Sequence, residues 1–215
     1  MTFSGFHSIA VLGVEGCSGR PFSAARGERR ALRRIVDDAC SAAGAGRHDV
    51  HRTGLGDGFV LAFHAATSRA DLTTRFVRAL DLAVRDHDEG AEPGAGFRLR
   101  VALHAGDVRF RAASWTGQAL GEACELAASE VMRRVLGSAP DAATALAVSA
   151  GWYAATVEQG RVDAAGFARV RVPLAGGGDA VAWVRVPGVA RPPGLTPADT
   201  LRLPRQAGGR LLLTE

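Results

Sequence analysis

Strand-like and helical segments alternate along most of this chain, and their order limits the folds that it can adopt. Strand-like runs occupy residues 7–14, 49–63, 97–108, 143–148 and 180–186, and helical runs occupy residues 23–43, 70–84 and 117–136. The helical runs repeat apolar residues at three- and four-residue spacing. The order strand, helix, strand, strand, helix, strand, helix, strand predicts an α+β fold, with helices packed on one face of a ferredoxin-like mixed or antiparallel sheet.

The predicted domain covers residues 1–188 of the 215-residue chain, in which 47% of residues are hydrophobic, enough for a sizeable core. Prolines and glycines dominate residues 189–215, which we expect to form a largely irregular tail. An acidic stretch with glycine and proline at residues 86–96 predicts an exposed loop between a helix and the next strand.

The 26 basic side chains are all arginine, because the sequence contains no lysine. Chemistry that needs an ε-amine, such as a Schiff base or a P-loop phosphate contact, is therefore excluded. The net charge is only +4, and acidic residues accompany the arginines in the run from Arg29 to Asp38. Such mixing is typical of a solvated helix face, so we expect no nucleic-acid partner despite a pI near 9.7.

The expected location is the cytoplasm, without a membrane partner. No run approaches the roughly twenty apolar residues of a membrane span, and the sequence does not start with a secretory signal pattern. Cys17, Cys40 and Cys124 lie far apart in the sequence, without the paired spacing of a zinc site or a disulfide framework. We therefore expect all three cysteines to be reduced.

The segment from Asp49 to Phe63 predicts a β-hairpin with Asp57 at its tip, among Gly54, Gly56 and Gly58. Glycines at a hairpin tip let the backbone approach a phosphate closely, and a carboxylate there can reach a metal ion. A turn selected only for its backbone angles would have a similar composition. The hairpin alone therefore leaves both interpretations open.

Four segments, in order, resemble motifs of the class III adenylate and guanylate cyclases, in particular the single-domain cyclase-like proteins common in actinobacteria. They read IAVLGVEGCS, LGDGFVLAF, RLRVALHAGDV and AVAWVRVPG. The first two resemble the metal-binding motifs of that family, the third its Arg-Ile-Gly-Ile-His-x-Gly-x-Val strand, and the fourth the closing strand of the actinobacterial group. The resemblance covers residues 8–188 and implies the cyclase fold and a head-to-tail dimer with nucleotide at the interface.

The resemblance also implies a pair of metal-binding positions. Family members use two aspartates to hold two divalent ions that activate the ribose 3′-hydroxyl and brace the triphosphate. The second aspartate falls on Asp57, but the first falls on Gly13, which has no side chain. Glu15 would point to the same side of the strand, yet a shift of about 6.5 Å exceeds normal metal-ligand tolerance. We expect Mg²⁺ or Mn²⁺ only if nucleotide binding is retained.

Two transition-state positions of the family are altered as well. The family pattern Gly-x-x-Val-Asn-x-Ala-x-Arg-Leu aligns with the segment that starts at Gly117, so the asparagine falls on Gly121 and the arginine on Glu125. A carboxylate in place of a cation would repel the negative charge that develops in phosphoryl chemistry, rather than stabilise it.

The nucleotide contacts that the resemblance implies are partly retained. Thr53 and Ser114 fall on the two base-reading positions, where both can form hydrogen bonds but neither specifies a base. Gly16, Cys17 and Gly56 fall in the turns that would lie near the phosphates.

Four further side chains of the same region are not expected to bind metal or nucleotide. Arg52 could reach a phosphate but is expected to be an exposed strand-end residue. His104 is expected to be a core or strand-end imidazole, and we do not expect His51 and His64 to join Asp57 on a metal.

The altered positions lead to two hypotheses. The first is a degenerate cyclase homology domain, a pseudoenzyme that serves in signalling as a regulatory, dimerisation or nucleotide-binding module. The alternative is an active cyclase that makes a cyclic nucleotide from a nucleoside triphosphate, through an unusual metal site at Asp57 or with the help of a heterodimer partner. Either hypothesis predicts a homodimer, or a heterodimer with a cyclase-like or regulatory protein.

Overall fold

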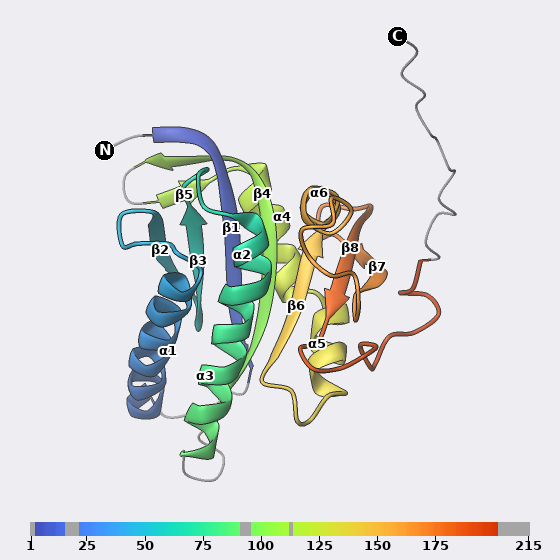
Figure 1. Cartoon of the computed structure of the whole chain (residues 1–215), viewed down its shortest axis with the longest axis horizontal. Helices are drawn as coiled ribbons and strands as arrows, with labels where there is room; N and C mark the ends of the chain where they lie inside the picture. Colours follow the sequence, from blue (N-terminus) through green and yellow to red (C-terminus); the bar gives the residue numbers. More distant parts are fainter. Residues whose placement is uncertain (1–2, 16–21, 91–95, 112–113, 202–215) are drawn as a thin grey trace.

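The computed structural model describes residues 3–15, 22–90, 96–111 and 114–201 (Figure 1). A single mixed sheet of eight strands forms its centre, in the order β2-β3-β1-β4-β6-β8-β7, with β5 paired to β4. All pairs are antiparallel except β4 with β6. The strands are β1 (Phe3–Glu15), β2 (Val50–Leu55), β3 (Gly58–Phe63), β4 (Arg98–Arg111), β5 (Ser114–Thr116), β6 (Thr144–Ser149), β7 (Ala168–Pro173) and β8 (Asp179–Arg185). The predicted α+β class and mixed sheet are confirmed.

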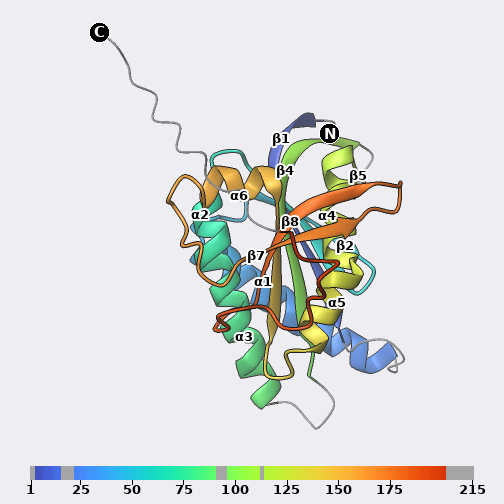
Figure 2. The same cartoon turned by 90° about the vertical axis from the view of Figure 1, so that its right-hand side faces the viewer.

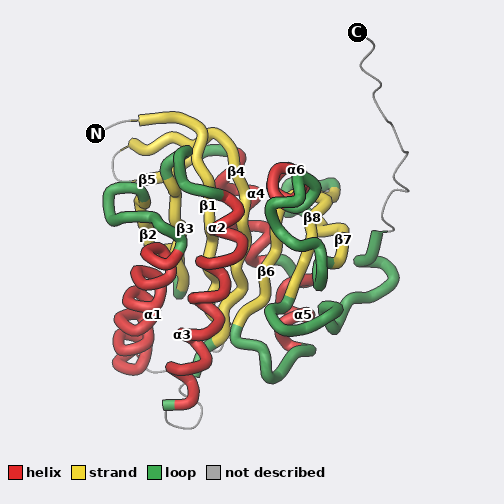
Figure 3. Tube along the Cα trace, viewed as in Figure 1, coloured by secondary structure: helices red, strands yellow, loops and turns green. Residues whose placement is uncertain are grey.

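Helices cover both faces of the sheet, so the expectation that they pack on one face is wrong. The helical segments are α1 (Phe22–Ala42), α2 (Arg69–Asp71), the π-helical turn η1 (Leu72–Phe76), α3 (Val77–Glu89), α4 (Gln118–Ala128), α5 (Glu130–Gly137) and α6 (Ala150–Thr156). Figure 3 shows α1 and α3 in front of the strands and α4 and α5 behind them, and Figure 2 shows α3 and α5 on opposite sides of the strands.

The physical reason for two covered faces is visible in β1. Ala10 and Leu12 belong to the core beneath α1 and α3, whereas Ile9 and Val11 belong to the core beneath α4 and α5. A strand that is apolar at every position must be covered on both faces, since either face left open would expose large apolar area to water.

The predicted helix at 117–136 is broken at Ser129, which separates α4 from α5. Ser129 is extended (φ −61°, ψ 149°), and its hydroxyl accepts a hydrogen bond from the backbone N–H of Met132 at 3.3 Å. This N-cap starts a new helix, although the apolar stripe continues across the break. The predicted loop at 86–96 is partly wrong too, because α3 continues to Glu89; residues 91–95 lie outside the described part.

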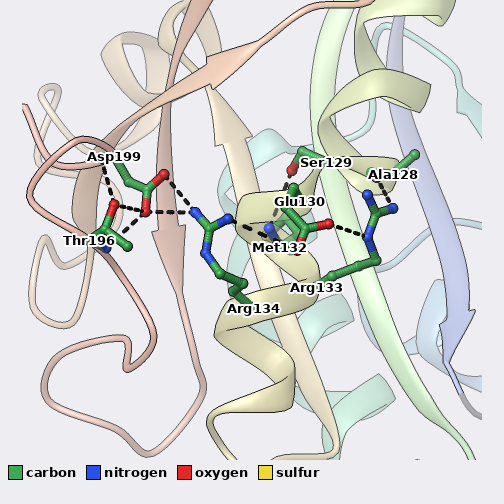
Figure 4. Close-up of polar contacts among 8 residues, drawn as sticks. All are labelled: Ala128, Ser129, Glu130, Met132, Arg133, Arg134, Thr196 and Asp199. Atoms are coloured by element: carbon green, nitrogen blue, oxygen red, sulfur yellow. Dashed lines mark hydrogen bonds and ion pairs between the residues drawn. The ribbon is translucent and has the colours of Figure 1, made fainter.

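The segment after β8 packs against the domain as far as residue 201. Nη2 of Arg134 on α5 lies 2.7 Å from both carboxylate oxygens of Asp199, as Figure 4 shows. Thr200 forms an isolated bridge with Val170 of β7. A charge-assisted arginine contact, in which Nη2 is shared by both carboxylate oxygens, and a backbone bridge thus hold this irregular segment in place. The division of the chain at residue 188 stays a prediction.

None of the helices in the described ranges has the length and apolar character that crossing a membrane requires.

Candidate nucleotide site

The β2–β3 hairpin packs closely against the end of β1. A Cβ atom at Gly58 would overlap the carbonyl oxygen of Leu12, so only glycine allows this approach. Gly56 in the turn has φ +54°, in the left-handed region that favours glycine. The local backbone therefore favours glycine at both positions. The two glycines together place Asp57 next to the end of β1, where Gly13 lies.

Asp57 is the residue that the resemblance aligns with a metal-binding aspartate. Its side chain is 55% exposed, and its Oδ1 lies 3.4 Å from Nη2 of Arg29 on α1. The arginine side chain is equally exposed, so the pair adds little stability. The carboxylate is thus accessible but already faces a cation.

Gly13, at the position of the other aspartate, lies directly across from Arg100 on β4. A Cβ atom on Gly13 would be 3.5 Å from Nη2 of Arg100. Nε of the same guanidinium lies 3.0 Å from Oε2 of Glu15, and only 14% of the arginine side chain is exposed. The space beside Gly13 is therefore bordered by a largely buried cation.

Arg100 is held in this position by α4. Its Nη1 donates a hydrogen bond at 2.9 Å to the carbonyl oxygen of Ala127, in the last turn of that helix. Carbonyls there lack partners within the helix, so an arginine is a favourable ligand for them. Burial lowers the pKa of Arg100 and Glu15 partly restores it, but an arginine remains protonated at neutral pH.

The residues present do not fit the two-ion arrangement that the resemblance implies. Glu15 is engaged with Arg100, so it does not take over the role of the missing aspartate. Within the described ranges, no three histidine, cysteine, aspartate or glutamate side chains gather where they could hold a metal ion. A single exposed carboxylate beside Arg29 and a guanidinium beside Gly13 form a site of different charge from a carboxylate pair.

On α4, the two altered transition-state positions differ in their surroundings. Gly121 is exposed, with open space around its Cα. The Oε2 atom of Glu125 accepts a hydrogen bond at 3.2 Å from the backbone N–H of Ala175, in the loop between β7 and β8. Glu125 thus ties that loop to α4, which gives the glutamate a structural role.

His104, on β4, faces α4. Its Nε2 lies 3.4 Å from Oε2 of Glu122, which also accepts a hydrogen bond from Gln118 at its other oxygen. Burial lowers the pKa of His104, and the charge of Glu122 opposes that shift in part. Its Nδ1 is buried without a hydrogen-bond partner in the described part of the chain.

The expected base-reading residues lie on strands that an aromatic cluster joins. Thr53 is half-buried on β2, and Ser114 begins β5. The His51 ring on β2 is 5.6 Å from the Trp115 ring on β5 and stacks at 6.3 Å on Phe110. Gly16 and Cys17, the other expected nucleotide contacts, lie outside the described residues.

The remaining polar residues around the hairpin have partners of their own. Arg52 forms an ion pair with Asp37 on α1, and this hydrogen bond holds the pKa of Asp37 below its usual value. Arg52 is thus on the α1 side of the sheet rather than free to reach a phosphate. Nδ1 of His64 accepts a hydrogen bond from the backbone N–H of Ala66 at 3.3 Å.

Arg100 and the contact between Glu125 and Ala175 were not among the residues expected at the site. Arg100 gave little signal of its own, because Arg98 lies two positions before it on the same strand. Its partner could be found only from the β1–β4 register, which places Gly13 opposite residue 100. The loop that contains Ala175 connects β7 and β8, and only β8 was expected from the sequence.

Comparisons with known proteins find similarity in structure. No protein-family model matches the sequence, and no curated protein matches it significantly. An adenylate/guanylate cyclase/hydrolase from Silicibacter pomeroyi superposes with a TM-score of 0.63 and 20% identity, over 87% of this chain and 99% of that one. The adenylyl cyclase CyaB from P. aeruginosa gives 0.57 and 12%, over 91% and 100%.

A third solved structure is a non-canonical dimeric guanylyl cyclase domain of the RhoGC fusion protein from the aquatic fungus Blastocladiella emersonii. It superposes with a TM-score of 0.52 and 13% identity, over 86% of this chain and 99% of that one. Each comparison spans nearly the whole of the other domain. The chain therefore has the fold of adenylate and guanylate cyclase domains.

Proposed function

We propose that the chain is a cyclase-fold module that does not cyclise nucleotides and acts as a regulatory, dimerisation or nucleotide-binding domain. The fold supports the general class, since the solved structures that resemble it are cyclase domains. The proposal that turnover is absent rests on the side chains, because a fold by itself does not determine an activity.

The observation that carries the proposal is the guanidinium of Arg100 beside Gly13. Two-ion phosphoryl chemistry needs carboxylates to balance the charge of both ions. Here one carboxylate is absent, and the nearest side chain at that position is a buried cation paired with Glu15. Like charges repel strongly in a partly buried setting, so this arrangement disfavours a divalent ion beside Gly13.

The residues on α4 support the same proposal. Glu125 replaces the phosphate-stabilising arginine of the family pattern and is bound to the Ala175 loop. Gly121 offers no hydrogen-bonding side chain. In a homodimer both copies lack the same groups, so self-association does not restore them.

A second candidate function, an active cyclase, is favoured by one observation: Asp57 remains exposed at the tip of a correctly formed hairpin. Under this candidate, a heterodimer partner supplies the groups missing at Gly121 and Glu125. The partner would be a second copy of a cyclase-like domain or a regulatory protein.

The effect of metal on nucleotide binding separates the two candidates. We would titrate the full chain with ATP and with GTP by calorimetry, with and without Mn²⁺, and repeat the titrations with Asp57→Ala. The proposed function predicts that Mn²⁺ changes the affinity by less than about twofold, and that Asp57→Ala has no larger effect. Binding that Mn²⁺ strengthens tenfold or more, and that Asp57→Ala abolishes, would contradict it.

A further inference from the structure

A pocket of about 380 Å³ lies on the face of the sheet that α1 and α3 cover, between the start of α3 and the end of β8. Gly13 and Arg100 belong to the other face. The pocket is thus separate from the candidate nucleotide site. Its lining residues are Thr73, Thr74, Val77, Arg78, Asp81, Leu82, Leu146, Arg185, Pro187 and Gly188.

One wall of the pocket is the π-helical turn η1, which is fixed by its own side chains. The hydroxyls of Thr73 and Thr74 donate hydrogen bonds at 2.7 Å to the carbonyl oxygens of Arg69 and Ala70. Nε1 of Trp152 donates to the Thr73 hydroxyl at 2.8 Å. The turn is therefore braced against α6, so the pocket wall is built by buried contacts.

Part of the pocket lining is apolar. Leu146 and Val77 are buried beneath the pocket, and Pro187 closes the side toward the segment after β8. Leu82 on α3 is 48% exposed, one of few large apolar side chains with such exposure in the described chain. A pocket of this size and lining suits the apolar body of a small ligand.

The charges around the pocket are unbalanced. The carboxylate of Asp81 accepts hydrogen bonds from Thr144 at 2.7 Å and from Arg85 at 3.0 Å, so it is already engaged. Arg78 and Arg185 have no ion pair with any described residue. Arg185 instead rests on the Phe167 ring, with its Cζ 5.5 Å from the ring centroid. Two guanidinium groups thus border an apolar pocket without a neutralising carboxylate of their own.

We propose that this pocket binds a small amphipathic anion, a carboxylate with an alkyl body, with the carboxylate between Arg78 and Arg185. Guanidinium groups bind carboxylates through charge-assisted hydrogen bonds, and the apolar body would cover the exposed side chain of Leu82. A cation of the same shape finds no free carboxylate here, because Asp81 is engaged by Thr144 and Arg85.

The test uses the full chain and three probes of similar shape: octanoate, octylammonium and 1-octanol. Binding is measured by ligand-observed NMR and calorimetry. Octanoate has about ten non-hydrogen atoms, and a ligand of this size should bind with a dissociation constant of about 1 mM. Octanoate should bind at least about fivefold more tightly than the other two probes, since only its charge matches the arginines.

Variants locate the site. Arg78→Gln and Arg185→Gln should each weaken octanoate binding about three- to tenfold, because each removes one charge-assisted contact. The control Arg75→Gln, in the π-helical turn that precedes Arg78 but paired with Asp71, should leave binding unchanged. Leu82→Glu places a carboxylate at the rim and should abolish binding, whereas Leu55→Glu, at a similarly exposed position on β2, should not.

Circular dichroism of each variant shows whether it is folded, so a loss of binding can be distinguished from a loss of structure. Leu82 is exposed, so its variant retains the fold even if Arg185→Gln does not. The proposal is overturned if octanoate does not bind, if octylammonium binds equally well, or if Arg78→Gln and Leu82→Glu bind octanoate as the unmodified chain does.

Discussion

Arg100 and Gly13 are cross-strand partners on β4 and β1, and the guanidinium of the first lies 3.5 Å from the position of a Cβ atom on the second. The same guanidinium pairs with Glu15 and with the last turn of α4. One side chain therefore joins the end of β1, the centre of the sheet and a helix on its α4 face. It does so at the position where the cyclase resemblance implies a metal-binding aspartate.

The first prediction concerns this ion pair. Arg100→Gln should lower the free energy of unfolding by about 2 kcal/mol, because it leaves Glu15 unpaired in a partly buried setting. Adding Glu15→Gln should recover about 1 kcal/mol, since the unpaired charge is then removed. Urea unfolding measures both. Arg171→Gln, in an exposed pair with Asp179, is the control and should change stability by less than about 0.5 kcal/mol. Equal effects of the two arginine variants would contradict the account.

The hairpin that carries Asp57 gives a second prediction. Gly58→Ala should cost about 3 kcal/mol or more, because its Cβ atom would overlap the backbone of β1. Gly54→Ala, four residues earlier, meets no atom within 4 Å and should be neutral or slightly stabilising. Thermal unfolding of the two variants separates a required glycine from an incidental one. Similar melting temperatures would show that the hairpin does not pack on β1 in this way.

These glycines also show how far the sequence could be interpreted. The hairpin and its tip were predictable, because strand-like runs around a glycine cluster leave few other structures. The role of Gly58 was not predictable, because it depends on a third strand far away in the sequence. Ser129 is a similar case: the apolar stripe continues through it, so only its N-cap hydrogen bond reveals the break. The site residue Arg100 was missed for the same reason as Gly58, since its neighbours come from the strand register.

The third prediction concerns the segment after β8. Asp199→Asn should weaken the contact with Nη2 of Arg134 and expose the backbone hydrogen bonds that Asp199 and Leu201 make with β7. Hydrogen exchange at the amides of Arg171 and Leu201 should become at least about tenfold faster. Asp163→Asn, at an exposed turn, should leave these amides protected. Unchanged protection in Asp199→Asn would mean that the bridge to β7 holds the segment alone.

The pKa of Asp199 determines how its contact with Arg134 responds to mild acid. Burial alone would raise that pKa, but the hydrogen bonds from Thr196 and Arg134 outweigh burial and lower it. A lowered carboxyl pKa means that the stabilising charge is lost only when the pH falls through the folded-state value. Protection of the Leu201 amide should therefore persist in mildly acidic buffer.

His104 provides a fourth prediction, on the pH dependence of stability. Because burial lowers its pKa below 6.5, the unfolded chain binds a proton more readily than the folded chain. The stability that neutral His104 contributes is therefore complete above about pH 6.5 and is lost as the pH falls through the folded-state pKa. His104→Gln should flatten the decline in unfolding free energy between pH 7 and pH 5, and exposed His48→Gln should not. An unchanged slope in His104→Gln would assign the decline to other groups.

The central claim is that this cyclase fold does not cyclise nucleotides. The most direct measurement is incubation of the purified chain with ATP, GTP, CTP or UTP and either Mg²⁺ or Mn²⁺, with cyclic products detected by mass spectrometry. The account predicts that no cyclic nucleotide forms and that Asp57→Ala behaves as the unmodified chain does. A cyclic product that the unmodified chain makes and Asp57→Ala does not make would contradict the claim.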